Sequence, residues 1–269
     1  MEVLKVKIFQ PEAHYRVPFS YQRRFTYPIP PFSTIKGLIC NLLNIKDDNN
    51  DNFKALKDGL HLSVYGKYES LLKEYIWFRN LSKQSHINRF RIPTNRIIDN
   101  VPEHPGGQSP IHIDVLNNVE LIIYIYIDKP DILNSICEAF KLLGDKNTTI
   151  HLGRAEDWLV INEVKMTTIA KGKTWFIPYF TWIPSLSNNY FFCEIKKEEY
   201  EKFYNSLRGN VFKLPTFYEI DNYQRIFNQY VSVKLFEGGT FKSIDLHMDK
   251  EENLPVILTK LFVNCQELK

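Results

Sequence analysis

Cysteine is scarce in this chain, and the few cysteines present lie far apart in the sequence. The four residues are Cys40, Cys137, Cys193 and Cys265. No two of them have the spacing of a zinc site or a redox-active pair, and their isolation also argues against a disulfide framework. We therefore expect neither a bound metal nor a cofactor.

Long apolar runs are also missing. The longest, residues 119–127, is interrupted by Glu120 and is too short to cross a bilayer. The first residues have no basic region followed by an apolar stretch, so they do not resemble a secretory signal. These absences predict a cytoplasmic protein with reduced thiols and no contact with a membrane.

Familiar catalytic motifs are absent as well. The sequence has no phosphate-binding P-loop and no nucleophile elbow. Glu156 and Asp157 are adjacent, so on a strand they would face opposite sides and could not act as an acid–base pair. His14, beside Tyr15 and Arg16, could assist attack by a ribose 2′-hydroxyl, although such neighbours are common by chance.

Charge and aromatic content leave two interpretations open. Lys and Arg number 34 against 31 Asp and Glu, and a net charge of +3 does not by itself indicate a nucleic-acid-binding protein. Aromatic residues make up 14% of the chain, which fits either a β-rich core or rings that stack on bases. An anionic partner must therefore be argued from local clusters.

The hydrophobic pattern of residues 1–165 predicts an α+β fold in the ferredoxin-like order β-α-β-β-α-β. One helix should begin after Pro31, capped by Ser33 or Thr34, and a second after Asp128. Gly37 lies early in the first helix, where it suggests close approach of another backbone. Strands are expected over residues 3–8, 61–68, 75–79, 111–127 and 158–164.

The remainder of the chain, residues 166–269, predicts a smaller β-rich C-terminal domain rich in Tyr and Phe, with one helix near residues 198–207. Between the expected strands of the first domain, residues 82–109 show no regular pattern and contain several arginines, prolines and glycines. A long irregular segment inside a compact domain is usually functional or disordered.

Three basic clusters are candidates for binding phosphate. The first surrounds Arg16, Arg23 and Arg24 and leads to the start of the first helix, whose free N–H groups and Lys36 favour an anion. The second, with Arg89 and Arg91, lies on the irregular segment, and the third is Gly153-Arg154 in a turn. Each is open to a plainer reading as a solvated loop or an ordinary turn.

Three stretches together resemble the CRISPR-associated Cas5 family of the RAMP superfamily, in a form similar to type I-B. The first is the opening strand running into Phe9-Gln10-Pro11 and Arg16. The second is the start of the first helix, with Pro30-Pro31, Ser33-Thr34 and Gly37-Leu38. The third is the Gly-Arg loop of residues 151–157.

This resemblance implies a non-catalytic subunit of a Cascade surveillance complex that binds the 5′ handle of crRNA and caps the backbone filament in antiviral defence. It implies an RRM-like domain with an inserted β-hairpin thumb at about residues 82–111. Its partners would be the backbone subunit, the large subunit and, through the complex, target DNA. The expected RNA contacts are Tyr15 and Tyr27 as stacking rings, with Arg16, Arg23, Arg24, Lys36, Gly37, Arg89, Arg91, Gly153 and Arg154.

Two other functions stay open at this point. In the type I-C branch, the equivalent subunit is an endoribonuclease that uses a Tyr-Lys-His set, and this chain has no adjacent Lys-His pair. A metal-independent nuclease that processes pre-crRNA would have to use His14 or His86. The second alternative is a protein–protein adaptor whose C-terminal half docks a large subunit and barely contacts RNA.

Overall fold

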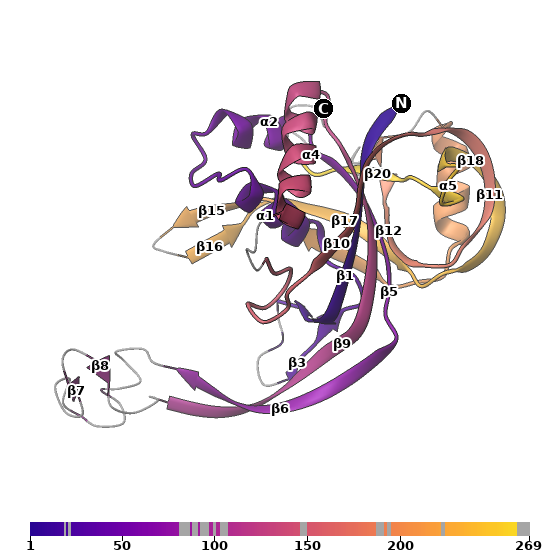
Figure 1. Cartoon of the computed structure of the whole chain (residues 1–269). Helices are drawn as coiled ribbons and strands as arrows, with labels where there is room; N and C mark the ends of the chain where they lie inside the picture. The colour runs from indigo at the N-terminus through magenta and orange to yellow at the C-terminus, as the bar shows by residue number, and fades with distance from the viewer. Residues whose placement is uncertain are drawn as a thin grey trace.

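The structure is a computed structural model (Figure 1). It describes residues 1–18, 20, 23–80, 87, 91, 97–98, 101–102, 107–145, 150–186, 191–192, 195–221 and 224–262. Among these residues, no helix has both the length and the apolar content needed to cross a membrane.

A four-strand unit at one end of the large sheet is compatible with the predicted ferredoxin-like order. Its strands are β1 (Glu2–Ala13), β5 (His61–Lys67), β9 (Gly107–Tyr126) and β10 (Val160–Thr168). They lie in the order β10-β1-β9-β5, and every neighbouring pair is antiparallel. Helix α1 (Phe32–Leu42) connects β1 toward β5, and α4 (Pro130–Asp145) connects β9 to β10.

The first helix begins where the prolines predict, but its cap differs from the prediction. Pro31 is the N-cap residue and no side chain caps the helix, so neither Ser33 nor Thr34 has that role. A further helix, α2 (Asp51–Gly59), was not predicted. The side chain of Asn50 accepts a hydrogen bond from the N–H of Asn52, which explains this start.

Strands from the C-terminal third continue the same sheet beyond β5. They are β12 (Phe180–Pro184), β17 (Tyr230–Phe236) and β14 (Val211–Pro215), in that order. Two short strands, β13 (Phe191–Phe192) and β20 (Leu258–Lys260), pair with each other, and β20 also pairs with β5. Because β10 runs through residue 165 and the sheet continues past it, the division into two domains stays a prediction.

The sheet is covered on both faces. On β9, Leu121, Ile123 and Ile125 pack with α1 and α4 in one core, whereas Ile122 and Tyr124 face a second core. The second core lies under α5 (Lys197–Ser206) and a smaller sheet. That sheet consists of β11 (Ala170–Ile177), β18 (Gly239–Asp249) and β19 (Leu254–Pro255).

A long β-hairpin projects from this body (Figure 1). It pairs β6 (Ser70–Asn80) with the first half of β9, from Ser70 opposite Asn117 to Asn80 opposite Gly107. We call this hairpin the arm. It supplies the inserted hairpin that the resemblance implies, although its paired part starts before the expected residues 82–111. Two short paired strands, β7 (Ile97–Ile98) and β8 (Val101–Pro102), lie near its end.

Candidate nucleic-acid interface

One of the predicted basic clusters lies at the base of the arm. The short strand β3 (Arg23–Arg24) pairs in parallel with β9, placing Arg23 opposite His112. On the other side of β9, Tyr75 of β6 is also opposite His112. Because residues directly opposite one another in a sheet face the same side, Arg23, His112 and Tyr75 form a row across three strands.

Two more rings extend this row. The Arg23 guanidinium lies 4.6 Å from the centre of the Phe25 ring, and Tyr75 lies 5.2 Å from His112 and 6.3 Å from Trp77, ring centre to ring centre. Tyr75 and Trp77 are more than half exposed, and Phe25 is 43% exposed. We call Arg23, Phe25, Tyr75, Trp77 and His112 the arm face.

The arm face has the chemistry that single-stranded nucleic acids bind. Exposed rings stack on unpaired bases of any sequence, and an arginine that is itself stacked can reach a phosphate. Arg16 lies beside it, since β2 (Tyr15–Arg16) pairs with β4 (Thr26–Tyr27). The side chain of Arg16 is exposed, and its Nη2 donates to the carbonyl of Ser20 over 3.3 Å.

Arg24 is turned away from this row. As the neighbour of Arg23 on the same strand, it faces the opposite side of the sheet, and it is partly buried. The predicted pair Arg23 and Arg24 is therefore divided between two faces, and only Arg23 belongs to the arm face.

Arg154 is not available to a phosphate, which corrects the prediction for the Gly-Arg loop. Its Nε donates to the buried carboxylate of Asp157 over 2.9 Å, and Nη1 lies 3.3 Å from Glu74. Glu156 and Glu12 are within 4 Å as well. These carboxylates already neutralise the guanidinium.

Gly153 is required by the loop itself. Its φ is +119°, and an added Cβ would lie 2.6 Å from Oδ2 of Asp157 and 2.9 Å from the carbonyl of His14. The side chain of Gln10 donates to the carbonyls of Leu152 and Asp157, which ties this loop to β1. Gly153 therefore allows the protein's own backbone and Asp157 to approach closely, and the space beside it is not open to a ligand.

The start of α1 is also unsuitable for a phosphate. Ile29 and Phe32 are fully buried, and the indole N–H of Trp182 donates to the carbonyl of Pro30 over 3.0 Å. Lys36 is 2% exposed, and its ammonium lies 4.4 Å and 4.8 Å from the ring centres of Phe217 and Tyr218. The predicted phosphate site at this helix is therefore wrong.

Gly37, in contrast, lies on the exposed side of the same helix. A Cβ built there would meet no atom within 4 Å. The space beside Gly37 is therefore open, as the predicted approach of another backbone requires.

Tyr15 and Tyr27 are core residues, so the prediction that they stack on bases is wrong. Tyr15 is 1% exposed, and its hydroxyl donates to Gln10 over 2.6 Å. Burial raises the pKa of this hydroxyl well above its usual value. Tyr27 is 5% exposed and packs edge-on against Trp182 and Phe212.

The irregular segment is described only in part. Arg91 is exposed and has a left-handed φ of 66°, while Arg89 and His86 lie outside the described residues. For these residues the predicted contacts stay predictions.

His14, the other histidine considered for cleavage of RNA, is 4% exposed. Its Nδ1 lies 2.7 Å from the carbonyl oxygen of Asp114, and its backbone N–H donates to Asp157. Burial lowers the pKa of the ring, and the nearby Arg154 charge lowers it further. In this conformation a substrate hydroxyl has no access to the ring.

Three carboxylates come close enough to suggest a metal site, but lysines occupy their surroundings. Oxygens of Glu163, Glu251 and Glu252 lie within 4.8 Å of one another. The buried ammonium of Lys5 lies within 3.1 Å of all three, and Lys7 and Lys165 add further ion pairs. This group is an electrostatic link between β1 and the C-terminal strands.

Sequence reasoning missed Tyr75, Trp77 and His112 as site residues. A signal was present, because the five apolar or aromatic residues among 71–77 occupy both odd and even positions, on either side of Lys73 and Glu74. A strand inside a sheet shows the same pattern, so the sequence cannot tell that β6 leaves its side chains uncovered.

Comparison with known proteins was made at the levels of family, sequence and structure. The family model described as CRISPR-associated protein (Cas_Cas5) matches residues 3–103. No curated protein sequence matches the chain.

Solved structures that resemble the chain are distant in sequence. A chain of a "CRISPR RNA-guided surveillance complex" is 11% identical, with 97% of this chain and 93% of that chain covered and a TM-score of 0.48. A CRISPR protein from Archaeoglobus fulgidus is 10% identical, with 96% and 99% covered and a TM-score of 0.42. A chain of the type III-B Cmr-beta complex bound to cognate target RNA and AMPPnP is 12% identical, with 95% and 86% covered and a TM-score of 0.43.

Proposed function

We propose that this chain, whose residues 3–103 match the Cas5 family of CRISPR-associated proteins, is a non-catalytic subunit of a type I Cascade surveillance complex that binds the 5′ handle of crRNA. The family match supports a role in a CRISPR effector complex. The observation that carries RNA binding is the arm face, where three exposed rings and a histidine lie in one row with Arg23.

The arm also supports contact with a neighbouring subunit. Leu72 and Ile76 are 48% and 36% exposed, and they lie on the face of β6 opposite to Tyr75 and Trp77. Exposed apolar side chains that share one face mark interaction sites in proteins. We assign these two residues to the backbone subunit that this protein caps, and the arm face to RNA.

Sequencing the RNA that copurifies with the tagged full-length chain in its complex tests this proposal. A constant 5′ end is expected. The double variant Tyr75→Ala/Trp77→Ala should retain at least about tenfold less RNA, because stacking contributes roughly 1–3 kcal/mol per base. Trp158→Ala removes an equally accessible ring at 47% exposure and is the matched control. Unchanged RNA occupancy in the double variant would contradict the assignment.

The proposal of a non-catalytic role has its own test. The buried position of His14 supports it, because a general base must reach the proton that it removes. Purified protein is incubated with a CRISPR repeat RNA in EDTA, and intact RNA is expected. Cleavage at a single position would instead establish the endoribonuclease alternative.

A further inference from the structure

A second exposed aromatic site lies on the small sheet of β11 and β18, on the other side of the body from the arm (Figure 1). Trp175 and Phe176 are 61% and 43% exposed, and their ring centres are 6.0 Å apart. Adjacent residues on a strand normally face opposite sides, so exposure of both rings requires an irregularity.

The pairing of β11 with β18 contains that irregularity. Thr174 is opposite Ile244, but Phe176 is opposite Thr240, so one residue of β11 faces residues 241–243 of β18. Bulges of this kind redirect side chains and are frequent beside binding sites. Trp175 lies at this bulge, and Lys242 is the middle one of the three β18 residues that it faces.

Cations surround the two rings. Lys173 is two residues before Trp175 on the same strand, and both Lys173 and Lys242 are exposed. Within the described residues, neither lysine forms an ion pair. Asp245 is the register partner of Lys173, and the nearby Glu252 carboxylate is held by Lys5 and Lys7. Lys173 and Lys242 therefore both contribute positive charge beside the rings, and Asp245 offsets part of it at Lys173.

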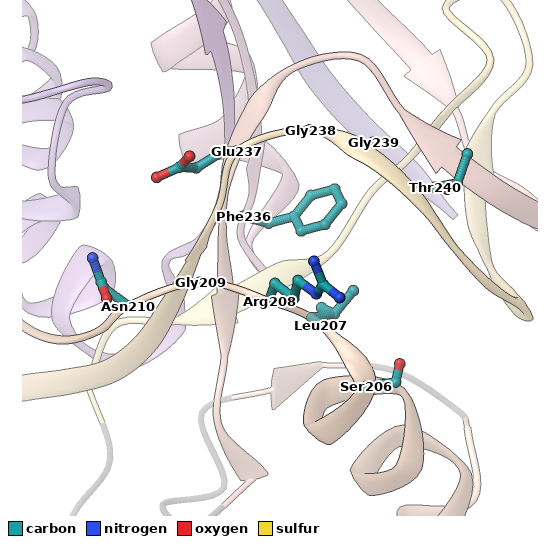
Figure 2. Close-up of a pocket in the computed structure, with 10 residues that line it drawn as sticks. All are labelled: Ser206, Leu207, Arg208, Gly209, Asn210, Phe236, Glu237, Gly238, Gly239 and Thr240. Carbon is teal, nitrogen blue, oxygen red and sulfur yellow. The ribbon is translucent and has the colours of Figure 1, made fainter.

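Two hollows adjoin the rings. One, of about 190 Å³, is lined by Lys173, Trp175, Phe176 and Asn253 among others. The other, of about 490 Å³, lies between the end of α5 and the turn from β17 to β18 (Figure 2). Thr240, which borders the second hollow, is the register partner of Phe176, which lines the first.

The second hollow is lined by an arginine side chain and by glycine backbone that has no side chain. The Arg208 side chain is exposed, and the Glu237 carboxylate points away from it (Figure 2). Gly239 forms part of the wall with a φ of +125°, and a Cβ there would meet no atom within 4 Å. The absence of a side chain lets a ligand backbone approach closely.

We propose that Lys173, Trp175, Phe176, Lys242 and Arg208 form a second binding site, for a single-stranded nucleic acid. Unpaired bases stack on the two rings, and the three cations contact the phosphates. A protein partner would use the same rings, but lysine is depleted in the cores of protein interfaces, so the unpaired lysines favour a phosphodiester chain.

The test measures fluorescence anisotropy of labelled oligouridylate and oligothymidylate with the purified full-length chain. The two probes distinguish RNA from DNA as the natural source. Trp175→Ala should weaken binding of at least one probe by about fivefold or more. Lys173→Gln/Lys242→Gln should lower the dependence of log K on log salt by about 1.4, since each phosphate contact on a single strand contributes about 0.7.

Trp158→Ala is the control for loss of an exposed tryptophan, and Tyr75→Ala/Trp77→Ala isolates the arm. If only the arm variant loses binding, the second site is refuted and the proposed function stands. If only Trp175→Ala loses binding, the second site stands and the arm face fails. Affinity of Trp175→Ala equal to that of the unaltered chain for both probes overturns this inference and points to a protein partner.

Discussion

Arg23 and Arg154 lie on opposite sides of the same part of the sheet, and the structure gives them opposite roles. Arg23 is exposed and stacks on Phe25, whereas Arg154 is surrounded by carboxylates and is 15% exposed. Both were predicted to bind phosphate. The difference shows that the function of an arginine here depends on which acidic side chains the fold brings within reach, and not on its motif.

The largest expected effect is a loss of stability when Asp157, the closest ion-pair partner of Arg154, is removed. Asp157 is fully buried and accepts hydrogen bonds from the backbone N–H groups of His14 and Arg154 and from the Arg154 guanidinium. Asp157→Ala should lower the free energy of unfolding by about 3 kcal/mol, because it leaves a largely buried charge without its closest partner. Urea denaturation measures this loss.

The neighbouring Glu156→Gln is the control for this prediction. Glu156 is 64% exposed, so its ion pair with Arg154 contributes little, and the stability should change by less than about 0.5 kcal/mol. Equal effects of the two substitutions would show that Asp157 is not the residue that holds the loop.

The next effect is on RNA binding and separates the two arginines directly. Arg23→Gln should weaken binding of oligouridylate severalfold, with no change in stability. The slope of log K against log salt should decrease in magnitude by about 0.7, the contribution of one phosphate contact on a single strand. Arg154→Gln should lower stability and leave the salt dependence unchanged. Anisotropy titrations over a salt series, combined with urea denaturation, measure both. The reverse result would exchange the roles assigned here.

A smaller effect concerns pH, because burial and Arg154 together lower the pKa of His14. The folded protein therefore favours the neutral ring more than the unfolded chain does. The contribution of His14 to the free energy of unfolding is complete above pH 6.5, the ordinary pKa of a histidine, and is lost as the pH falls below that value. Below pH 6.5, the melting temperature of His14→Gln should fall less steeply with decreasing pH than that of the unaltered chain. The buried His61, whose pKa is also lowered by burial, contributes to the fall that remains, and Glu251 and Glu252, whose pKa values are lowered by lysines, contribute at lower pH.

The smallest expected effect is a gain in stability at Gly37. A methyl group there meets no other atom, and alanine is favoured over glycine inside a helix, so Gly37→Ala should stabilise the isolated chain by about 0.5–1 kcal/mol. Thermal unfolding measures the gain. If assembly of the complex is impaired at the same time, a partner approaches this side of α1. A loss of stability would mean that the space is not open in solution.

The fold was largely predictable because its signals are local. Ile35, Leu38 and Ile39 follow the helical period and are all buried, and the prolines before them fix where α1 begins. Helix α2 was missed because its polar sequence and Asn50 cap look like a loop. The two-sided burial of residues 121–125 followed from their apolar run.

The site was much less predictable because its residues depend on distant parts of the chain. Glu74, which pairs with Arg154, is 80 positions away in the sequence, and Trp182, which covers Pro30, is 152 positions away. Tyr15 looked suited to stacking because of its basic neighbours, but the sheet turns its ring inward toward Gln10. Tyr75 and Trp77 became candidates only because the fold leaves both rings more than half exposed.

Strand β9 links the arm to the body as a single continuous element. Its first half pairs with β6 and β3, and its second half is held between β1 and β5. A load on the arm is therefore transmitted along one peptide backbone into the most deeply buried part of the sheet. The direction of the arm in an assembly is therefore set by the same backbone hydrogen bonds that hold the core strands together.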